Sequence, residues 1–284
     1  MRSLILHGHL FKNAGSTFDW SLRRCFEDNF LDHRDDESMR EGGNEFLKSL
    51  ILKNPGLMAI SSHVMPLLHS YPDEIKIIPI YFLRHPLLRV RSVYEFELRQ
   101  LPATTPGAIE AKNRSFREYI AWRLDEKVGA IIRNYHSRYL GGLRRRGPSA
   151  KGDKEDFETA LQTLSQTPIA PIVEHYDSSM IILEEALKPL FTTIDLSYVA
   201  QNVLQKEDKE ITLDEKLLGL QNDLGELYDD LVTANRFDLL LYEAGIELLY
   251  SKKEKISKFE NKLYHFNHRC DCLKKESELE FTKT

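Results

Sequence analysis

The stretch Lys12-Asn13-Ala14-Gly15-Ser16-Thr17 lies between a short apolar run and a helical pattern, and it decides the fold. The run Ser3–His7 is typical of a buried parallel strand, and apolar residues from Phe18 to Phe30 recur near helical spacing. A strand, a turn of small residues and a helix form a cradle for an anion, because the N–H groups of the turn and the positive end of the helix point to one place. The sequence therefore predicts a phosphate-like ligand at Lys12–Thr17.

This stretch differs from the Walker A pattern, in which a lysine directly precedes the serine or threonine that holds Mg²⁺. Here Lys12 comes three residues before Gly15. The strongest predicted strand, Ile75–Leu83, is followed by Arg84-His85-Pro86 and not by the carboxylate that P-loop nucleotidases use for Mg²⁺. The pattern therefore favours a nucleotide with several anionic groups and no requirement for a metal.

Short apolar segments alternate with helical patterns along the first two thirds of the chain. The predicted strands are Ser3–His7, Gly56–Ser61, Ile75–Leu83 and Pro168–Val173. Such alternation predicts an α/β protein with three layers, α/β/α, around a central parallel sheet, followed by a mostly helical C-terminal half. Pro79 predicts an irregular or edge position for its strand. We expect one domain over residues 1–250 and a charged helix or tail over residues 251–284.

The composition is that of an ordinary globular protein, with 284 residues, 42% hydrophobic and 29% charged. A formal charge of -5 argues against a general nucleic-acid binder. No run approaches the ~20 apolar residues of a membrane span, and the apolar start is too short for a signal peptide. We therefore expect a cytoplasmic protein with no membrane or nucleic-acid partner.

The C-terminal region contains a Cys-x-Cys pair, Cys270 and Cys272, close to His265 and His268. These residue types leave a metal site open, although a zinc site usually has two pairs of ligands at regular spacing. The alternative is two free thiols in a reducing compartment.

Several segments in order make the chain similar to the PAPS-dependent sulfotransferases, above all to the carbohydrate and heparan-sulfate-type branch (PAPS is 3′-phosphoadenosine 5′-phosphosulfate). Lys12–Thr17 resembles the 5′-phosphosulfate loop of this family, where Lys-Thr-Gly-Gly-Thr is common. Tyr81–Pro86, followed by Arg89 and Ser92-Val93-Tyr94, resembles its 3′-phosphate element. Asn134–Leu140 is similar to its Asn-x-Gln-x-Arg-x-Leu segment, and Pro171–Ser179 is similar to a segment that follows a strand. The similarity is spread over residues 3–245.

The resemblance implies a P-loop-NTPase-like sulfotransferase fold and direct in-line transfer of a sulfuryl group from PAPS to a hydroxyl, with no metal. Lys12 would stabilise the charge on the leaving phosphate, and His63, after the second predicted strand, would be the base, since imidazole titrates near neutral pH. The residues that would bind PAPS are Lys12, Asn13, Ala14, Gly15, Ser16, Thr17, Arg84, Ser92 and Arg138. The branch of the family suggests a carbohydrate as acceptor.

The chain departs from the family pattern at several positions. Asn13-Ala14 replaces Thr-Gly, and an alanine is tolerated there only if its φ stays negative. His85 replaces an acidic or amide residue, and His136 replaces glutamine. The cationic groups of the pattern remain.

Each singled-out residue also has a plainer interpretation. Lys12–Thr17 could simply cap a helix, His63 could be a hydrogen-bonded histidine at a strand end, and Arg84 and Arg138 could be structural. The run Arg144–Arg146 could bind an acidic polymer or lie in a solvated loop. Two other functions therefore stay open, namely a kinase on a P-loop-like scaffold and a non-catalytic protein that binds PAPS or a glycan. The acceptor and the oligomeric state cannot be read from the sequence.

Overall fold

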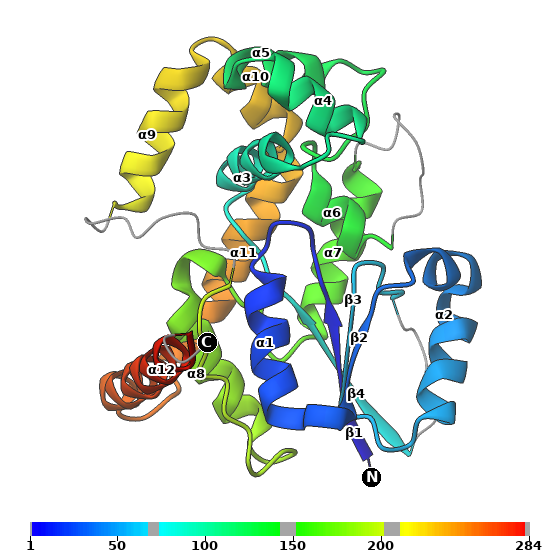
Figure 1. Cartoon of the computed structure of the whole chain (residues 1–284), viewed down its shortest axis with the longest axis vertical. Coiled ribbons are helices and arrows are strands. Elements are labelled where there is room, and N and C mark those ends of the chain that lie inside the picture. Colours follow the sequence, from blue (N-terminus) through cyan, green and yellow to red (C-terminus); the bar gives the residue numbers. More distant parts are fainter. Residues whose placement is uncertain (1, 68–73, 143–151, 202–210, 282–284) are drawn as a thin grey trace. The chain divides into compact units, whose positions relative to one another are not determined.

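The computed structural model describes residues 2–67, 74–142, 152–201 and 211–281 (Figure 1). Contacts divide the chain into two compact units. Unit 1 comprises Met1–Leu83, Leu164–Leu204 and Gly245–Thr284, and unit 2 comprises Arg84–Thr163 and Gln205–Ala244. The division expected at residue 250 separates one domain from a C-terminal helix or tail and not two compact units, and it stays a prediction.

Unit 1 is built on a sheet of four parallel strands in the order β2-β3-β1-β4. Their bounds are β1 Arg2–Gly8, β2 Phe30–His33, β3 Ala59–Ser62 and β4 Ile75–Tyr81. The α/β class and three of the predicted strands are confirmed. In this sheet β4 is an edge strand, in agreement with Pro79, which has no N–H to donate to a further strand.

Two sequence predictions about strands were wrong. Phe30 does not end a helix but begins β2, because Phe26–Phe30 leaves the helix through a short 3₁₀ turn, Glu27–Asn29. Pro168–Val173 forms no strand; it makes a single parallel bridge, between Leu83 and Ile172, and continues into the 3₁₀ turn Val173–His175.

Helices α1 (Gly15–Phe26) and α2 (Asp36–Lys53) lie on opposite sides of the sheet (Figure 1). The connectivity explains this arrangement. α1 leads from β1 outward to β2, whereas α2 leads from β2 back to β3, and right-handed crossovers in opposite directions place their helices on opposite faces. The strand β1 therefore lies inside the sheet, and the loop that follows it faces the carboxyl edge, where ligands of parallel sheets bind.

The C-terminal region of unit 1 is a helix, α12 (Phe259–Phe281), which packs on α8 (Tyr176–Leu187). Phe266 and Cys270 are buried in this contact, and Arg269 donates to Glu184 at 2.7 and 2.9 Å. The predicted charged helix is thus an integral part of unit 1. Among the described residues, no helix combines the length and the apolar character needed to cross a membrane.

Unit 2 contains helices only, so far as its described residues go. They are α3 (Pro86–Arg99), α4 (Pro106–Asn113), α5 (Phe116–Leu124), α6 (Tyr135–Leu140), α7 (Lys154–Ser165), α9 (Leu213–Leu224), α10 (Leu227–Ala234) and α11 (Arg236–Lys253). The last residues of α7 and α11 belong to unit 1. This content confirms the predicted helical C-terminal half.

A pair of reciprocal side-chain caps fixes α6 against α11. The buried carboxylate of Asp238 accepts hydrogen bonds from the N–H of His136, the N–H of Ser137 and the hydroxyl of Ser137, each at 2.8 Å. In return, the side-chain oxygen of Asn134 accepts from the N–H groups of Phe237 and Asp238, at 3.1 and 3.3 Å. Each side chain satisfies the unpaired donors at the start of the other helix.

The first prediction concerns this pair of caps. Asp238→Ala leaves two buried N–H groups without an acceptor, so we expect it to lower the free energy of unfolding of unit 2 by about 3 kcal/mol. The measurement is urea unfolding followed by the fluorescence of Trp122, which lies in unit 2, in a Trp20→Phe background. Asp230→Ala, at an exposed position of α10, is the matched control and should change little. Equal midpoints for the two variants would contradict this role of Asp238.

Candidate functional site

The strand register of unit 1 aligns four backbone positions at the carboxyl edge of the sheet. His33 is in register with Ser62, and Ser62 and Tyr81 are both in register with Gly8. The residues that follow these four positions are Arg34, His63, His9 and Phe82. Three polar residues, Arg34, His63 and His9, thus follow neighbouring strands at this edge, and no single segment of sequence contains them.

Asp19 of α1 is a buried carboxylate that pairs with His7, His9 and Arg34. His7 Nδ1 lies 2.8 Å from Asp19 Oδ1, and His9 Nδ1 lies 2.7 Å from Asp19 Oδ2. Arg34 donates to Asp19 Oδ2 at 2.8 Å. An ionised carboxylate can only accept, so both histidines carry a proton on Nδ1. Burial raises the pKa of Asp19, but the charge and hydrogen bond of His7 and the hydrogen bond of His9 outweigh it and hold that pKa far below its ordinary value.

His7, His9 and Asp19 also form the one group of metal-ligating side chains found among the described residues, with ligand atoms within 4.8 Å of one another. Two imidazoles and a carboxylate suit several divalent metals. However, the guanidinium of Arg34 lies 3.3 Å from His9 Nδ1 and already neutralises Asp19. A second cation there would be repelled, and the group therefore fits a hydrogen-bonded network better than a metal centre.

The predicted anion loop follows His9 in the chain. Lys12, with φ 65°, is half-buried, and Ala14, with φ 57°, precedes α1 as its N-terminal cap residue. The condition under which an alanine is tolerated here, a negative φ, is therefore not met, and Ala14 carries strain that glycine would avoid. Among the described residues, no side chain caps the start of α1, so its first N–H groups have no such acceptor.

Two side chains of the loop tie it to the rest of unit 1. Asn13 is buried and donates to the carbonyl of Phe82 at 2.6 Å. Thr17 Oγ1 accepts from the N–H of Gln201 at 3.1 Å. Ser16 is exposed. Asn13 is therefore a structural anchor of the loop, while Lys12 is half-buried and Ser16 is the exposed member.

Gly15 is the residue of the loop Lys12–Thr17 that the ring of His9 contacts. A Cβ at this position would lie 2.3 Å from His9 Cδ2 and 2.5 Å from His9 Nε2, closer than real Cβ atoms approach. Only glycine lets the imidazole of His9 rest on the first residue of α1. The ring of His9 in turn meets the edge of the His63 ring, at 4.8 Å between centroids.

His63, the predicted base, thus lies beside His9, and its side chain is 44% exposed. Its Nδ1 lies 3.5 Å from Asp36 Oδ2, a long contact. Partial burial lowers the pKa of His63, and the nearby His9 and Arg34 lower it further. His63 is therefore neutral at neutral pH, as a base must be, but it is held loosely.

The other predicted binding residues lie in unit 2, where cationic side chains gather around the start of α3. Arg89 is fully buried, donates to the carbonyl of Ile131 and lies 4.2 Å from the centre of the Tyr135 ring. Burial lowers its pKa to about 10. Arg84 is half-buried and close enough to lower the pKa of both Arg89 and His136. This positive environment is the feature of unit 2 that suits an anion.

The Asn134–Leu140 motif divides into structural and candidate binding residues. Asn134 and the backbone of His136 belong to the reciprocal caps, and burial keeps the pKa of the His136 ring well below its ordinary value. Arg138 is half-buried, and burial lowers its pKa as well. Ser92 lies on α3 and is 9% exposed. The sequence reasoning missed Asp19, Arg34 and Asp238; an acidic residue on the buried face of the first helix was the available signal for Asp19.

Among the described residues, the cysteine pair and its neighbouring histidines form no group of metal ligands. Cys270 is buried and accepts from the N–H of Tyr198 at 3.4 Å, whereas Cys272 is exposed and lies 3.8 Å from His268 Nδ1. The two thiols therefore have different surroundings. Arg144–Arg146 lies outside the described residues.

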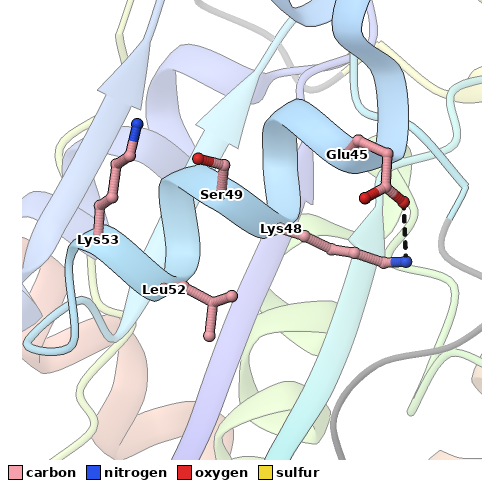
Figure 2. A pocket seen from close by; sticks show the side chains of 5 residues that line it. All are labelled: Glu45, Lys48, Ser49, Leu52 and Lys53. Atoms are coloured by element: carbon pink, nitrogen blue, oxygen red, sulfur yellow. Dashed lines mark hydrogen bonds and ion pairs between the residues drawn. The ribbon is translucent and has the colours of Figure 1, made fainter.

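A surface hollow of about 460 Å³ lies on α2, away from these residues (Figure 2). Its lining is Glu45, Lys48, Ser49, Leu52 and Lys53. All five side chains come from one helix, and Lys48 is paired with Glu45 at 3.1 Å. The hollow lacks polar groups that converge from several elements, so we do not assign the site to it.

Comparison with known proteins gives one informative relative. A protein of Archaeoglobus fulgidus, described as uncharacterized, is 32% identical to this chain over 255 residues, which cover 87% of the chain and 97% of the archaeal protein. The chain belongs to the family of this archaeal protein. The coverage extends over both units. No family model matches the chain.

The second prediction concerns the buried histidines of unit 2. Burial lowers the pKa of His85 to about 4, so the unfolded chain binds this proton more readily than the folded one between about pH 4 and its ordinary pKa near 6.5. The contribution of His85 to stability is therefore fully present above that pH range and is lost as the pH falls through it. His85→Gln should reduce the loss between pH 7.5 and pH 5 by about 2 kcal/mol.

Urea midpoints from Trp122 fluorescence at both pH values measure this loss. His265→Gln, at an exposed position of α12, is the control. A pH dependence that is the same in both variants would show that His85 is not the group responsible.

Proposed function

We propose that this chain is a PAPS-dependent sulfotransferase that transfers a sulfuryl group to a hydroxyl, with a carbohydrate as the acceptor class. The observation that carries the proposal is the loop Lys12–Thr17 at the carboxyl edge of a parallel sheet, with the imidazole of His9 packed against its Gly15 and the ring of His63 against His9. It unites an uncapped helix N-terminus, a lysine and a neutral base at one place. These are the groups that sulfuryl transfer requires.

In this proposal unit 1 binds the 5′-phosphosulfate. The start of α1 supplies N–H donors and a positive dipole end, and Lys12 supplies a full charge. As the bond between sulfur and the bridging oxygen breaks, negative charge grows on the leaving phosphate, and Lys12 stabilises it. A P-loop-like sulfotransferase fold is consistent with the parallel sheet and with helices on both of its sides.

The resemblance assigns the 3′-phosphate to Arg84 and Ser92, with Arg138 as a further contact. Support comes from the positive environment at the start of α3, where Arg84 and Arg89 lower the pKa of His136. A guanidinium binds a phosphate through two parallel hydrogen bonds and keeps its charge at all physiological pH values.

The reaction is a direct displacement without a covalent enzyme intermediate. The acceptor oxygen attacks sulfur, the electron pair of the broken bond stays on the phosphate, and PAP, the 3′,5′-bisphosphate of adenosine, leaves. The proton of the hydroxyl passes to a base. No step calls for a metal, and a cytoplasmic location stays a prediction.

A kinase is the competing function. It would need a carboxylate free to hold Mg²⁺ near the loop. Asp19 is the acidic side chain of α1, and both of its oxygens already accept hydrogen bonds from His7, His9 and Arg34. This occupation favours the sulfotransferase over the kinase. A non-catalytic PAPS-binding or glycan-binding protein would share the donor site and differ only in turnover.

The third prediction tests the donor site by calorimetric titration with PAP in the absence of Mg²⁺. Lys12→Ala and Arg84→Ala each remove a charged contact to a phosphate, so each should weaken PAP binding about 10- to 100-fold. Lys53→Ala, in the hollow of Figure 2, removes a lysine of the same unit and should leave the affinity unchanged.

A parallel titration with ATP and Mg²⁺ separates the competing functions. Binding of ATP with Mg²⁺ and no binding of PAP would reject the sulfotransferase and favour the kinase. PAP binding that survives in Lys12→Ala would reject the assignment of the loop.

A further inference from the structure

The environments of the neighbouring residues His9 and His63 differ in one respect that matters for proton transfer. The Nδ1 proton of His9 is held by Asp19 at 2.7 Å in a buried setting, so its Nε2 carries the free electron pair. Among the described residues, Nε2 of His9 has no hydrogen-bond partner. It rests on Gly15, at the start of the helix that is assigned the sulfuryl donor.

His63 lacks such a fixed orientation. Its contact to Asp36 is 3.5 Å long and joins two partly exposed side chains, with 44% and 35% exposure. Nothing in that contact selects one tautomer, and water competes for both ring nitrogens. The side chain of His9, by contrast, is 10% exposed and is enclosed by the carboxylate of Asp19 and by the loop Lys12–Thr17.

We propose that His9, and not His63, is the catalytic base, and that Asp19 is its positioning residue. This inference rests on the proposed sulfotransferase function. The hydroxyl proton of the acceptor moves to Nε2 of His9 as the acceptor oxygen bonds to sulfur, and the electron pair of the broken S–O bond leaves with PAP. Asp19 fixes the tautomer beforehand and stabilises the imidazolium that forms. The imidazolium then releases its proton to water.

The charges around His9 set the pH range of this step. They come from His7 on its own strand, Asp19 on α1, Arg34 after β2 and His63 after β3. Burial lowers the pKa of His9 most, His7 and Arg34 lower it further, and Asp19 opposes them. His9 is therefore neutral at neutral pH, with its proton on Nδ1 and none on Nε2, and its activity as a base should be lost on the acid side.

The first arm of the test needs no turnover. Nitrogen-15 NMR of the imidazoles in the full chain should show His9 at pH 7 as the neutral tautomer with its proton on Nδ1. Asp19→Asn should change the tautomer populations of His9. A His9 that is doubly protonated at pH 7, or that carries its proton on Nε2, overturns the inference.

The second arm measures release of PAP from PAPS, with water and with an unsulfated uronate-containing polysaccharide as acceptors. His9→Gln should lower the rate about 10²- to 10⁴-fold with unchanged PAP affinity, and His63→Gln should have the smaller effect. Asp19→Asn should lower the rate and move the acid limb of its pH profile to lower pH, because the carboxylate raises the pKa of His9. His265→Gln is the control for substitution of a histidine.

The outcomes separate this inference from the proposed function. Full turnover in His9→Gln, or a larger loss in His63→Gln, overturns the role of His9 and leaves the sulfotransferase standing. A wild-type chain that binds no PAP, or that binds PAP and leaves PAPS intact with both acceptors, overturns the transfer reaction and the role of His9 with it.

Discussion

The carboxylate of Asp19 is the interaction on which the carboxyl edge of unit 1 depends. A charge that is 4% exposed must be paired, because an isolated buried carboxylate would cost several kcal/mol. Asp19 is paired three times, with His7 of β1, with His9 directly after β1 and with Arg34 directly after β2. The first helix, the central strand and the edge strand β2 are thereby held in one arrangement, and the loop Lys12–Thr17 lies between two of these anchored elements.

The same interaction has chemical consequences. Because Asp19 accepts from both Nδ1 atoms, the two histidines keep a defined tautomer, and His9 presents its free electron pair at the start of α1. A structural requirement, the pairing of a buried charge, thus fixes the ring of His9 beside the first residue of α1. Gly15 is necessary for this arrangement, since a side chain there would push His9 away.

Unit 2 also contains a buried carboxylate that needs partners, that of Asp238. This carboxylate is also fully buried, but backbone N–H groups at the start of α6 and the hydroxyl of Ser137 satisfy it. Its negative charge raises the pKa of Arg89, whereas Arg84 lowers it, and both arginines lower the pKa of the buried His136.

The sequence by itself determined the α/β class, three of the four strands and the helical C-terminal half, because these depend on local apolar periodicity. It did not find β2, whose Phe30 continues the apolar spacing of the preceding helix, and it added a strand at Pro168–Val173, where the structure has a single bridge. His63 and the members of Lys12–Thr17 were named from sequence, and their binding role stays a prediction. Only the tertiary structure decided that His9 meets His63 and that Asp19 holds His9, because parallel register aligns residues 8, 33, 62 and 81, which directly precede residues 9, 34, 63 and 82 and are far apart in the chain.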